Sequence, residues 1–409
     1  MSRRSQIRRS ISPLRDFLRT ESAGGAVLLV ATAMALVWAN SPWRGAYGSL
    51  WSAVVGMEPF GLHLRMDVGH WVNDALMTAF FLVVGLEIKR EATSGHLASR
   101  EAIALPFAAA LGGMVVPALA YLAIAGRTAA GGWGVPMATD IALALGALAV
   151  LGRSLPGGAR AFLLGLAVID DIGAIVVIAL FYSGGVDAAW LAAAGAALAV
   201  AVVMARRGVQ SLALVAPVGA ALWLALHEAG VHATLAGVAM GLLAPTAPRH
   251  GTSLVDAEDR RAPSAPGSVS VVEWLLHRLH PWSAFVVLPI FALANAGIPL
   301  GRGDLAAAAG SPVSWAVATG LVLGKPLGVI VGAWVAVRWG FARLPDGLGW
   351  RGVLAVGCAA GFGFTVALFV SELAFTDATQ GRDATVGILA ASVASALACG
   401  AAARRARAR

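Results

Sequence analysis

Charged residues are scarce in this sequence. Asp, Glu, Lys and Arg make up 13% of its 409 residues, about half of the share found in soluble domains. Hydrophobic residues make up 58%, and the mean hydropathy is +0.78. These values exclude an ordinary soluble domain and indicate an all-α polytopic membrane protein without a separate soluble domain.

Cysteine is almost absent too. Cys358 and Cys399 are the only two, and both fall in expected spans, so neither a disulfide framework nor a cysteine metal site is indicated. No small-residue cleavage pattern follows the basic N-terminus at the right distance, so we expect no removable signal peptide. The net charge of +8 is spread over short segments between spans, so we expect no nucleic acid as a partner.

Apolar stretches of about 20 residues, the length of a membrane-spanning helix, recur along the chain, and we expect about twelve spans between residues 22 and 403. A segment 1–21 precedes them and a basic tail 404–409 follows. The expected spans are 22–40, 71–88, 102–125, 133–151, 161–182, 187–205, 211–226, 230–245, 283–299, 313–337, 352–374 and 384–403.

The basic residues set the expected orientation, because cytoplasmic loops hold most Lys and Arg. With both termini in the cytoplasm, 24 of the 30 basic residues face inward, and Lys325 lies within a span. Only five of the 30 basic residues face outward, namely Arg44, Arg65, Arg127, Arg302 and Arg382.

Two connecting segments have distinct patterns. Residues 45–68 include the apolar run Leu50 to Val55, the separator "MEPF" and an alternating run around Leu62 and Leu64, which together predict a strand-turn-strand hairpin on the outer face. Such a hairpin is marginal alone, so we expect it to pair with something, such as a second copy of the chain. Residues 246–280 include a polar, Pro- and Ser-rich stretch, which we interpret as a flexible cytoplasmic loop.

Four charged residues lie at mid-span and at similar depth: Asp140, Asp170, Asp171 and Lys325. Each costs about 2.5 to 3.5 kcal/mol at a helix centre on insertion scales, so we expect a shared site. Asp170 and Asp171 point about 100° apart on a helix, and only one of them can turn toward Lys325. A buried salt-bridge cluster that only holds the helices together is the structural alternative.

Helix breakers lie beside these charges. Pro136 and Thr139 precede Asp140, and Gly357, Gly361 and Gly363 interrupt the span 352–374. Two interrupted spans in corresponding halves of a transporter are a sequence indication of its binding site, although glycines also serve close helix packing. The triplets 102–182 and 313–403 begin on opposite sides, which predicts an inverted-topology repeat with two discontinuous helices.

A mechanism follows from this chemistry. Carboxylate oxygens suit a hard monovalent cation such as Na⁺ or Li⁺, and burial makes a carboxylate bind protons more tightly. Protons and the cation then compete for the same oxygens. A site that crosses the membrane only when loaded exchanges one ion for the other.

At these residues the chain resembles the NhaA-type bacterial sodium/proton antiporters over nearly its whole length. The matching motifs are "WVNDALMTAFFLVVGLEIKRE" (71–91), "GVPMATDIALALGAL" (134–148), "AVIDDIGAI" (167–175), "GVHATLAGV" (230–238), "HPWSAFVVLPIFALANAGI" (280–298), "LVLGKPLGV" (321–329) and "GFGFTVALF" (361–369).

The resemblance implies a role for each mid-span charge. Asp171 and Asp140 are then the carboxylates that bind Na⁺ (or Li⁺) and H⁺, with Thr139 beside them. Asp170 pairs with Lys325, which neutralises the site and can itself release a proton, although Lys325 can also be purely structural. No resident cofactor is implied.

The resemblance also implies the wider architecture. A core domain (102–182 and 313–403) moves against an interface domain (22–88 and 187–299), and the two broken helices cross at the membrane midplane. The protein lies in lipid of the bacterial inner membrane as a homodimer joined partly by the outer hairpin. It exchanges more protons than sodium and is activated at alkaline pH.

The family's pH-responsive cluster has counterparts at the cytoplasmic side, although a solvated helix end explains such residues equally well. Leu276 stands where the family often has glutamate, and Glu273 one turn earlier is a candidate substitute. Asp74 also matches, with a structural role expected. The cluster comprises Glu87, Glu91, His232, His277 and His280.

Two other classes of protein remain as alternatives. An intramembrane aspartyl protease also uses two aspartates in neighbouring spans, but its "GxGD" pattern is missing before Asp171. A proton-coupled carrier of an organic solute needs a larger pocket with aromatic or arginine contacts, and no arginine occurs at mid-span.

Overall fold

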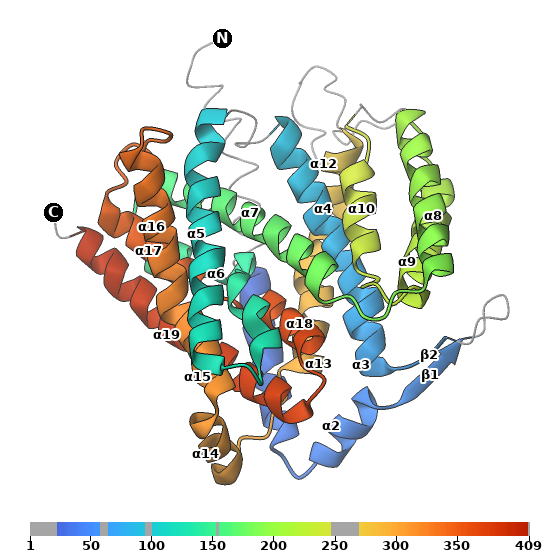
Figure 1. The fold of residues 1–409 in the computed structure, drawn as a ribbon, viewed down its shortest axis with the longest axis horizontal. Helices are drawn as coiled ribbons and strands as arrows, with labels where there is room; N and C mark the ends of the chain where they lie inside the picture. Colours follow the sequence, from blue (N-terminus) through green and yellow to red (C-terminus); the bar gives the residue numbers. More distant parts are fainter. Residues whose placement is uncertain (1–22, 58–63, 95–99, 153–154, 247–269, 408–409) are drawn as a thin grey trace, which may run out of the picture. The chain divides into compact units, whose positions relative to one another are not determined.

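The computed structural model describes residues 23–57, 64–94, 100–152, 155–246 and 270–407. Helices dominate these residues, as Figure 1 shows. Contacts divide the chain into two compact units, each described below by itself. The first comprises Met1–Gly69, Ser99–Ala174 and Leu288–Arg409, and the second comprises His70–Ala98 and Ile175–Val287.

The first unit begins with the helix Ala23–Ala39 and a helix α2 (Arg44–Trp51) bent away from it by 115°. Strands β1 (Val54–Met57) and β2 (Leu64–Asp67) then pair antiparallel, with Val54 opposite Asp67. Leu50, expected near the first strand, lies in α2 instead. The unit further contains α5 (Arg100–Ala125), a 3₁₀ helix η4 (Ala130–Met137), α6 (Ile141–Leu151), most of α7 (Gly157–Phe181), α13 (Leu288–Asn295), α14 (Arg302–Gly310), α15 (Pro312–Thr319), a π-helical turn η6 (Gly320–Gly324), α16 (Lys325–Arg338), α17 (Trp350–Ala360), α18 (Phe364–Ala374) and α19 (Ala378–Arg407).

The second unit is also helical. A short helix α3 (Val68–Trp71), whose last two residues belong to this unit, runs through a π-helical turn η2 (Val72–Leu76) into α4. The other elements are α4 (Met77–Ser94), the end of α7, α8 (Ala188–Arg206), α9 (Leu212–Glu228), α10 (Leu235–Leu243), α12 (Val271–Trp282) and a π-helical turn η5 (Ser283–Val287).

The described residues contain six helices long and apolar enough to span a membrane, or up to nine if each bent pair is one span. The chain is therefore a multi-pass membrane protein, as its composition predicts. The expected spans 211–226, 230–245 and 283–299 are not among these helices, and α9 and α10 have only 17 and nine residues. The count of twelve, the inverted repeat and the crossing of the broken helices stay predictions.

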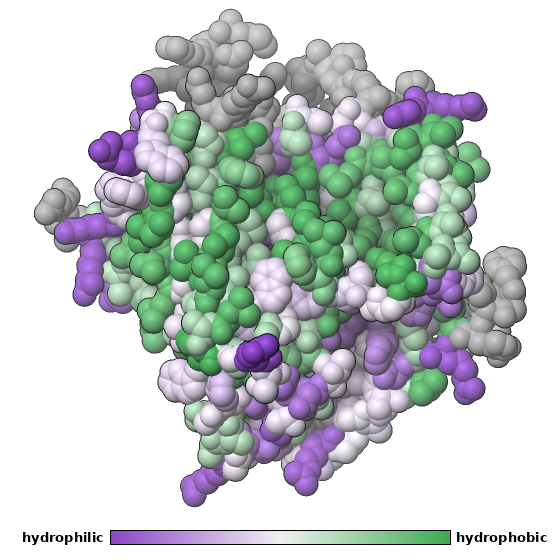
Figure 2. All heavy atoms as spheres, viewed as in Figure 1, coloured by the Kyte–Doolittle hydropathy of each residue, from purple (hydrophilic) through white to green (hydrophobic). Residues whose placement is uncertain are grey.

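Helices α5 and α16 make the most extensive contact in the first unit. Their backbones approach so closely that a Cβ on Gly328 would overlap the carbonyl oxygen of Gly112. Small residues permit this approach, as between membrane helices generally. Leu111, Val115 and Leu119, spaced four residues apart on α5, are instead exposed, and Figure 2 shows hydrophobic residues along the visible sides of α5 and α16. These sides suit contact with lipid.

In the second unit, α4 packs against α10 in the same way, with Gly85 facing Gly241. At the start of this unit the indole of Trp223 stacks with Trp71 and with His227. His227 Nδ1 lies 3.4 Å from Asp74 Oδ2. Asp74 therefore connects η2 to α9.

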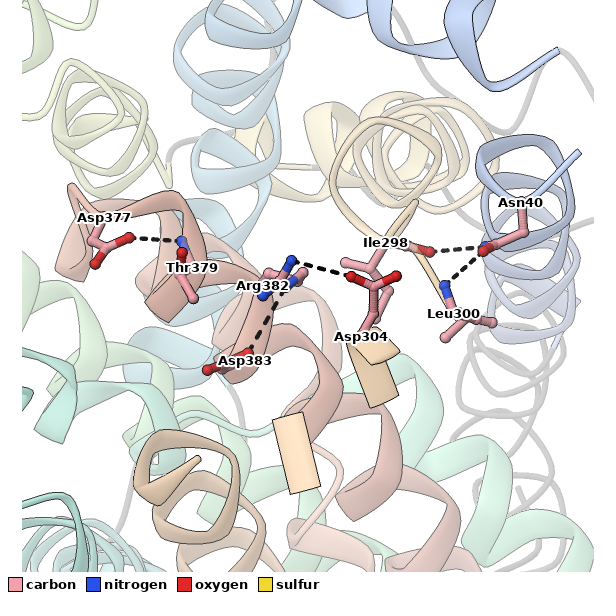
Figure 3. A network of polar contacts seen from close by, with 8 residues as sticks. All are labelled: Asn40, Ile298, Leu300, Asp304, Asp377, Thr379, Arg382 and Asp383. Atoms are coloured by element: carbon pink, nitrogen blue, oxygen red, sulfur yellow. Dashed lines mark hydrogen bonds and ion pairs between the residues drawn. The ribbon is translucent and has the colours of Figure 1, made fainter. Parts of the chain in front are cut away.

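A polar network lies near the ends of the first unit's helices (Figure 3). The Asn40 amide donates to the Ile298 carbonyl at 2.8 Å, and its oxygen accepts from the Leu300 amide at 2.6 Å. Arg382 lies 3.5 Å from Asp304 and 3.8 Å from Asp383. The Arg382–Asp304 pair is partly exposed, so it contributes about 1 kcal/mol or less, whereas the two Asn40 bonds fix the loop after α13.

Candidate functional site

Two helix breaks lie against each other in the first unit. Residues 138–140 separate η4 from α6, and the two helices lie at 45° to each other. Residues 361–363 separate α17 from α18, which lie at 49° to each other. The Thr139 hydroxyl lies 2.9 Å from the Ala360 carbonyl oxygen, and the Asp140 amide donates to the Phe362 carbonyl. Backbone groups that the breaks leave without helical bonds thus satisfy one another, as low-dielectric surroundings require.

The Asp140 carboxylate joins the two breaks. Its Oδ1 accepts from the Leu143 amide at 3.0 Å and caps α6. Its Oδ2 accepts from the amide of Thr365 at 3.1 Å and from the hydroxyl at 2.6 Å. The side chain is 2% exposed. Because helix N-termini attract negative charge, the starts of α6 and α18 both stabilise the charged carboxylate.

Asp170 and Lys325 form a second contact in the same region. Lys325 Nζ lies 2.8 Å from Asp170 Oδ2, and both side chains are fully buried. Lys325 also donates to the Met137 carbonyl at the end of η4. The Thr139 hydroxyl lies 2.8 Å from the same Asp170 oxygen. Thr139 therefore contacts Asp170 and the end of α17, and it directly precedes Asp140 in the chain.

Asp171 follows on α7 and is 5% exposed. It points about 100° away from Asp170 around the helix, so Asp170 is the aspartate that contacts Lys325. The site thus combines three buried acidic side chains with one buried basic side chain. When all four are ionised, it carries surplus negative charge, which a proton or a metal cation can neutralise.

Comparison with known proteins decides the family. A family model described as Na⁺/H⁺ antiporter 1 matches residues 15–402. The chain belongs to this family. It is 45% identical to the Na(+)/H(+) antiporter NhaA 2 of Sorangium cellulosum, over 94% of this chain and 88% of the relative. It is 47% identical to the Na(+)/H(+) antiporter NhaA of Acidovorax sp. (92% and 88%), and 44% identical to that of Shewanella loihica (94% and 95%).

Membership of the antiporter family confirms the resemblance read from the motifs. The protein is a multi-pass membrane protein of the sodium/proton antiporter family, and the names of its relatives indicate a transporter. The intramembrane protease and the organic-solute carrier are therefore set aside.

Sequence reasoning missed several groups that this antiporter places at the site. Thr365 and the carbonyl groups of Met137, Ala360 and Phe362 contact the expected residues directly. Thr365 lies in the motif "GFGFTVALF", immediately after the glycines that break the helix. The available sequence signal for Thr365 was a hydroxyl side chain directly after the glycines that break the span.

Several of the residues expected to respond to pH make close contacts. His280 Nε2 lies 3.6 Å from Glu87 Oε1, which joins α12 to α4. Glu91 is 7% exposed and lies 3.4 Å from Arg90. His232 Nε2 lies 2.6 Å from the Tyr182 carbonyl oxygen. His277, by contrast, is exposed on α12.

The departure at Leu276 has a clear structural setting. Leu276 is 5% exposed and packs with Val83 and Leu86 of α4 in a hydrophobic cluster. Glu273, the candidate substitute, forms a capping box with Ser270 at the start of α12. Leu276 therefore makes an apolar contact between α4 and α12.

Proposed function

We propose that this antiporter exchanges Na⁺ or Li⁺ for H⁺ by letting the two kinds of ion compete for the buried carboxylates Asp140 and Asp171. The observation that carries the proposal is the surplus of buried acidic side chains at the contact between two helix breaks. A surplus of this kind needs a mobile positive charge. Oxygen ligands from carboxylates, hydroxyls and carbonyls suit a hard cation.

Each residue then has a defined part. Asp171 and Asp140 bind Na⁺ or H⁺ in turn, and Thr139 offers a hydroxyl oxygen beside them. Lys325 compensates Asp170, and the fully buried geometry of that pair supports the assignment. Because a buried ammonium without its partner is unfavourable, a proton on Asp170 would favour proton release from Lys325.

The wider behaviour follows from alternating access. The loaded, neutralised site faces either side of the membrane, whereas the empty charged site crosses poorly. The distribution of basic residues supports cytoplasmic termini in a bacterial inner membrane. The exposed pair Val54 and Val55 on β1 supports a homodimer joined by the outer hairpin, since an isolated two-stranded sheet is marginal.

The pH response is assigned to the cytoplasmic cluster. The Glu87–His280 pair is its most direct contact, and Glu91, His232 and His277 are the further candidates. Since the side chains of Glu87 and His280 are each 13% exposed, the pair senses protons from water without being fully screened.

Transport in everted membrane vesicles tests the proposal. Adding Na⁺ outside vesicles with an acid interior should raise the internal pH for the unmodified protein and have no effect for Asp171→Asn. Asp346→Asn, at an exposed loop position, is the matched control and should transport normally. An Asp171→Asn protein that folds and still raises the internal pH would show that the cation site lies elsewhere.

A further inference from the structure

Asp140 is bound by a hydroxyl group that the proposed exchange does not use. The Thr365 hydroxyl lies 2.6 Å from Asp140 Oδ2, and Thr365 is 1% exposed. Its amide donates to the same oxygen at 3.1 Å. Two donors from one residue thus converge on one carboxylate oxygen.

The position of Thr365 connects this contact to the second helix break. Thr365 is the second residue of α18, and Gly363 at the N-cap offers no side chain to cap the helix. Asp140, which caps α6 through Leu143, therefore also caps α18 from outside. One carboxylate stabilises two helix starts, and the charge state of that carboxylate affects both.

A hydroxyl group can serve both states of such a carboxylate. It has one proton to donate and two lone pairs to accept. It donates to the charged, empty Asp140, and after rotation it accepts from a protonated Asp140 or contacts a bound cation. An amide can only donate, so the amide of Thr365 favours the charged carboxylate alone.

We propose that Thr365 is a positioning residue of the ion site, which holds Asp140 charged against α18 and so sets how strongly H⁺ competes with Na⁺. This inference rests on the proposed function, because it assumes that Asp140 binds the exchanged ions. It adds a residue that controls the pH range and the apparent Na⁺ affinity of that site.

The helices that carry the breaks or pack against them hold other ionisable groups, which Thr365→Val does not replace. They are Asp170 and Asp171 on α7, Lys325 on α16, Cys358 on α17, Glu372 on α18 and Cys399 on α19. A change in pH dependence between the unmodified protein and Thr365→Val therefore reports the hydroxyl itself.

The test is the pH profile of Na⁺-driven proton release from everted vesicles, with the apparent KM for Na⁺ at each pH. Thr365→Val keeps the shape and the amide but loses the hydroxyl. A hydrogen bond to a charged group corresponds to about one to two pH units. We expect the acidic limb to move about one unit to higher pH. We also expect the KM for Na⁺ to rise about tenfold on that limb, with little change at alkaline pH, where few protons compete.

Three further variants make the result specific. Thr365→Ser keeps the donor and should restore the unmodified profile. Thr365→Cys, with a weak thiol donor, should shift the profile in the same direction by less, and it replaces the valine variant if that protein does not accumulate. Thr385→Val is the control, because the buried Thr385 hydroxyl donates only to the Gly381 carbonyl in its own helix at 3.0 Å.

The variant Asp140→Asn distinguishes a failure of the role proposed for Thr365 from a failure of the proposed ion site. If Asp140→Asn abolishes exchange while the valine and cysteine variants keep the unmodified profile, the role of Thr365 is wrong and the proposed site stands. A lower melting temperature with an unchanged profile would likewise show that Thr365 is only structural. If Asp140→Asn exchanges normally, the proposed site itself fails.

Discussion

Replacing Lys325 with methionine tests the energetic part of the site. Methionine preserves most of the apolar volume of the lysine side chain, so the change removes the charge without a large cavity. The Lys325 Nζ–Asp170 Oδ2 distance is 2.8 Å, and both side chains are 0% exposed. Solvent therefore does not screen the pair, and removing one partner should cost about 3 to 5 kcal/mol.

This free-energy cost corresponds to a lower melting temperature. With about 2.1 cal/mol/K per residue, 409 residues correspond to an unfolding entropy of about 0.9 kcal/mol/K. We therefore expect Lys325→Met to melt about 4 to 6 °C below the unmodified protein, measured by tryptophan fluorescence in detergent at pH 8.5. At pH 5.5 the difference should be smaller, because Asp170 in the folded variant can neutralise its charge by binding a proton that the unfolded chain does not bind.

The double variant Lys325→Met with Asp170→Asn provides the control. Removing both charges leaves neither one buried alone, so most of the stability should return. Equal melting temperatures of Lys325→Met and the unmodified protein at pH 8.5 would show that the Lys325–Asp170 pair does not stabilise the fold. If Lys325→Met then also lost exchange, Lys325 would have a role in transport only.

Two further changes test the packing and the pH response. Gly328→Leu should lower stability by about 1 to 3 kcal/mol, because its side chain would push α5 away at Gly112. Gly195→Ala in α8, where a Cβ meets no atom within 4 Å, should instead stabilise by up to about 1 kcal/mol, and equal melting of both variants would contradict the packing account. Glu87→Gln removes a charge 3.6 Å from His280 Nε2. Because His280 then loses its proton more easily, the proposed alkaline activation should begin at lower pH. An unchanged onset in vesicles would exclude this pair from the pH response.

The sequence predicts the members of the site better than their contacts. A charge within a hydrophobic span is so unfavourable that Asp140, Asp170, Asp171 and Lys325 stand out from hydropathy alone. Threonine carries no such signal, because it occurs in membrane helices for many reasons. The role of Thr365 as a partner of Asp140 depends on two breaks that are far apart in the chain, and only the folded structure brings them together.

The fold shows the same limit. Hydropathy marks apolar stretches, but it does not say where a helix ends, so the expected span 230–245 contains only the nine-residue helix α10. The alternation around Leu64 predicts β2, whereas the first strand begins at Val54 and leaves Leu50 in a helix. Close packing of Gly112 on Gly328 requires knowledge of which helices are neighbours, and the spacing of glycines along one helix does not give it.

In the proposed mechanism, one set of buried carboxylates holds either H⁺ or Na⁺. Isothermal titration calorimetry of Na⁺ into the purified protein, in two buffers with different ionisation enthalpies, counts the protons released per bound ion. We predict proton release on binding and an apparent Kd for Na⁺ that rises as the pH falls, by about tenfold per unit for each proton displaced. Sodium binding that releases no protons, with the same Kd from acid to alkaline pH, would show that H⁺ and Na⁺ do not share these carboxylates.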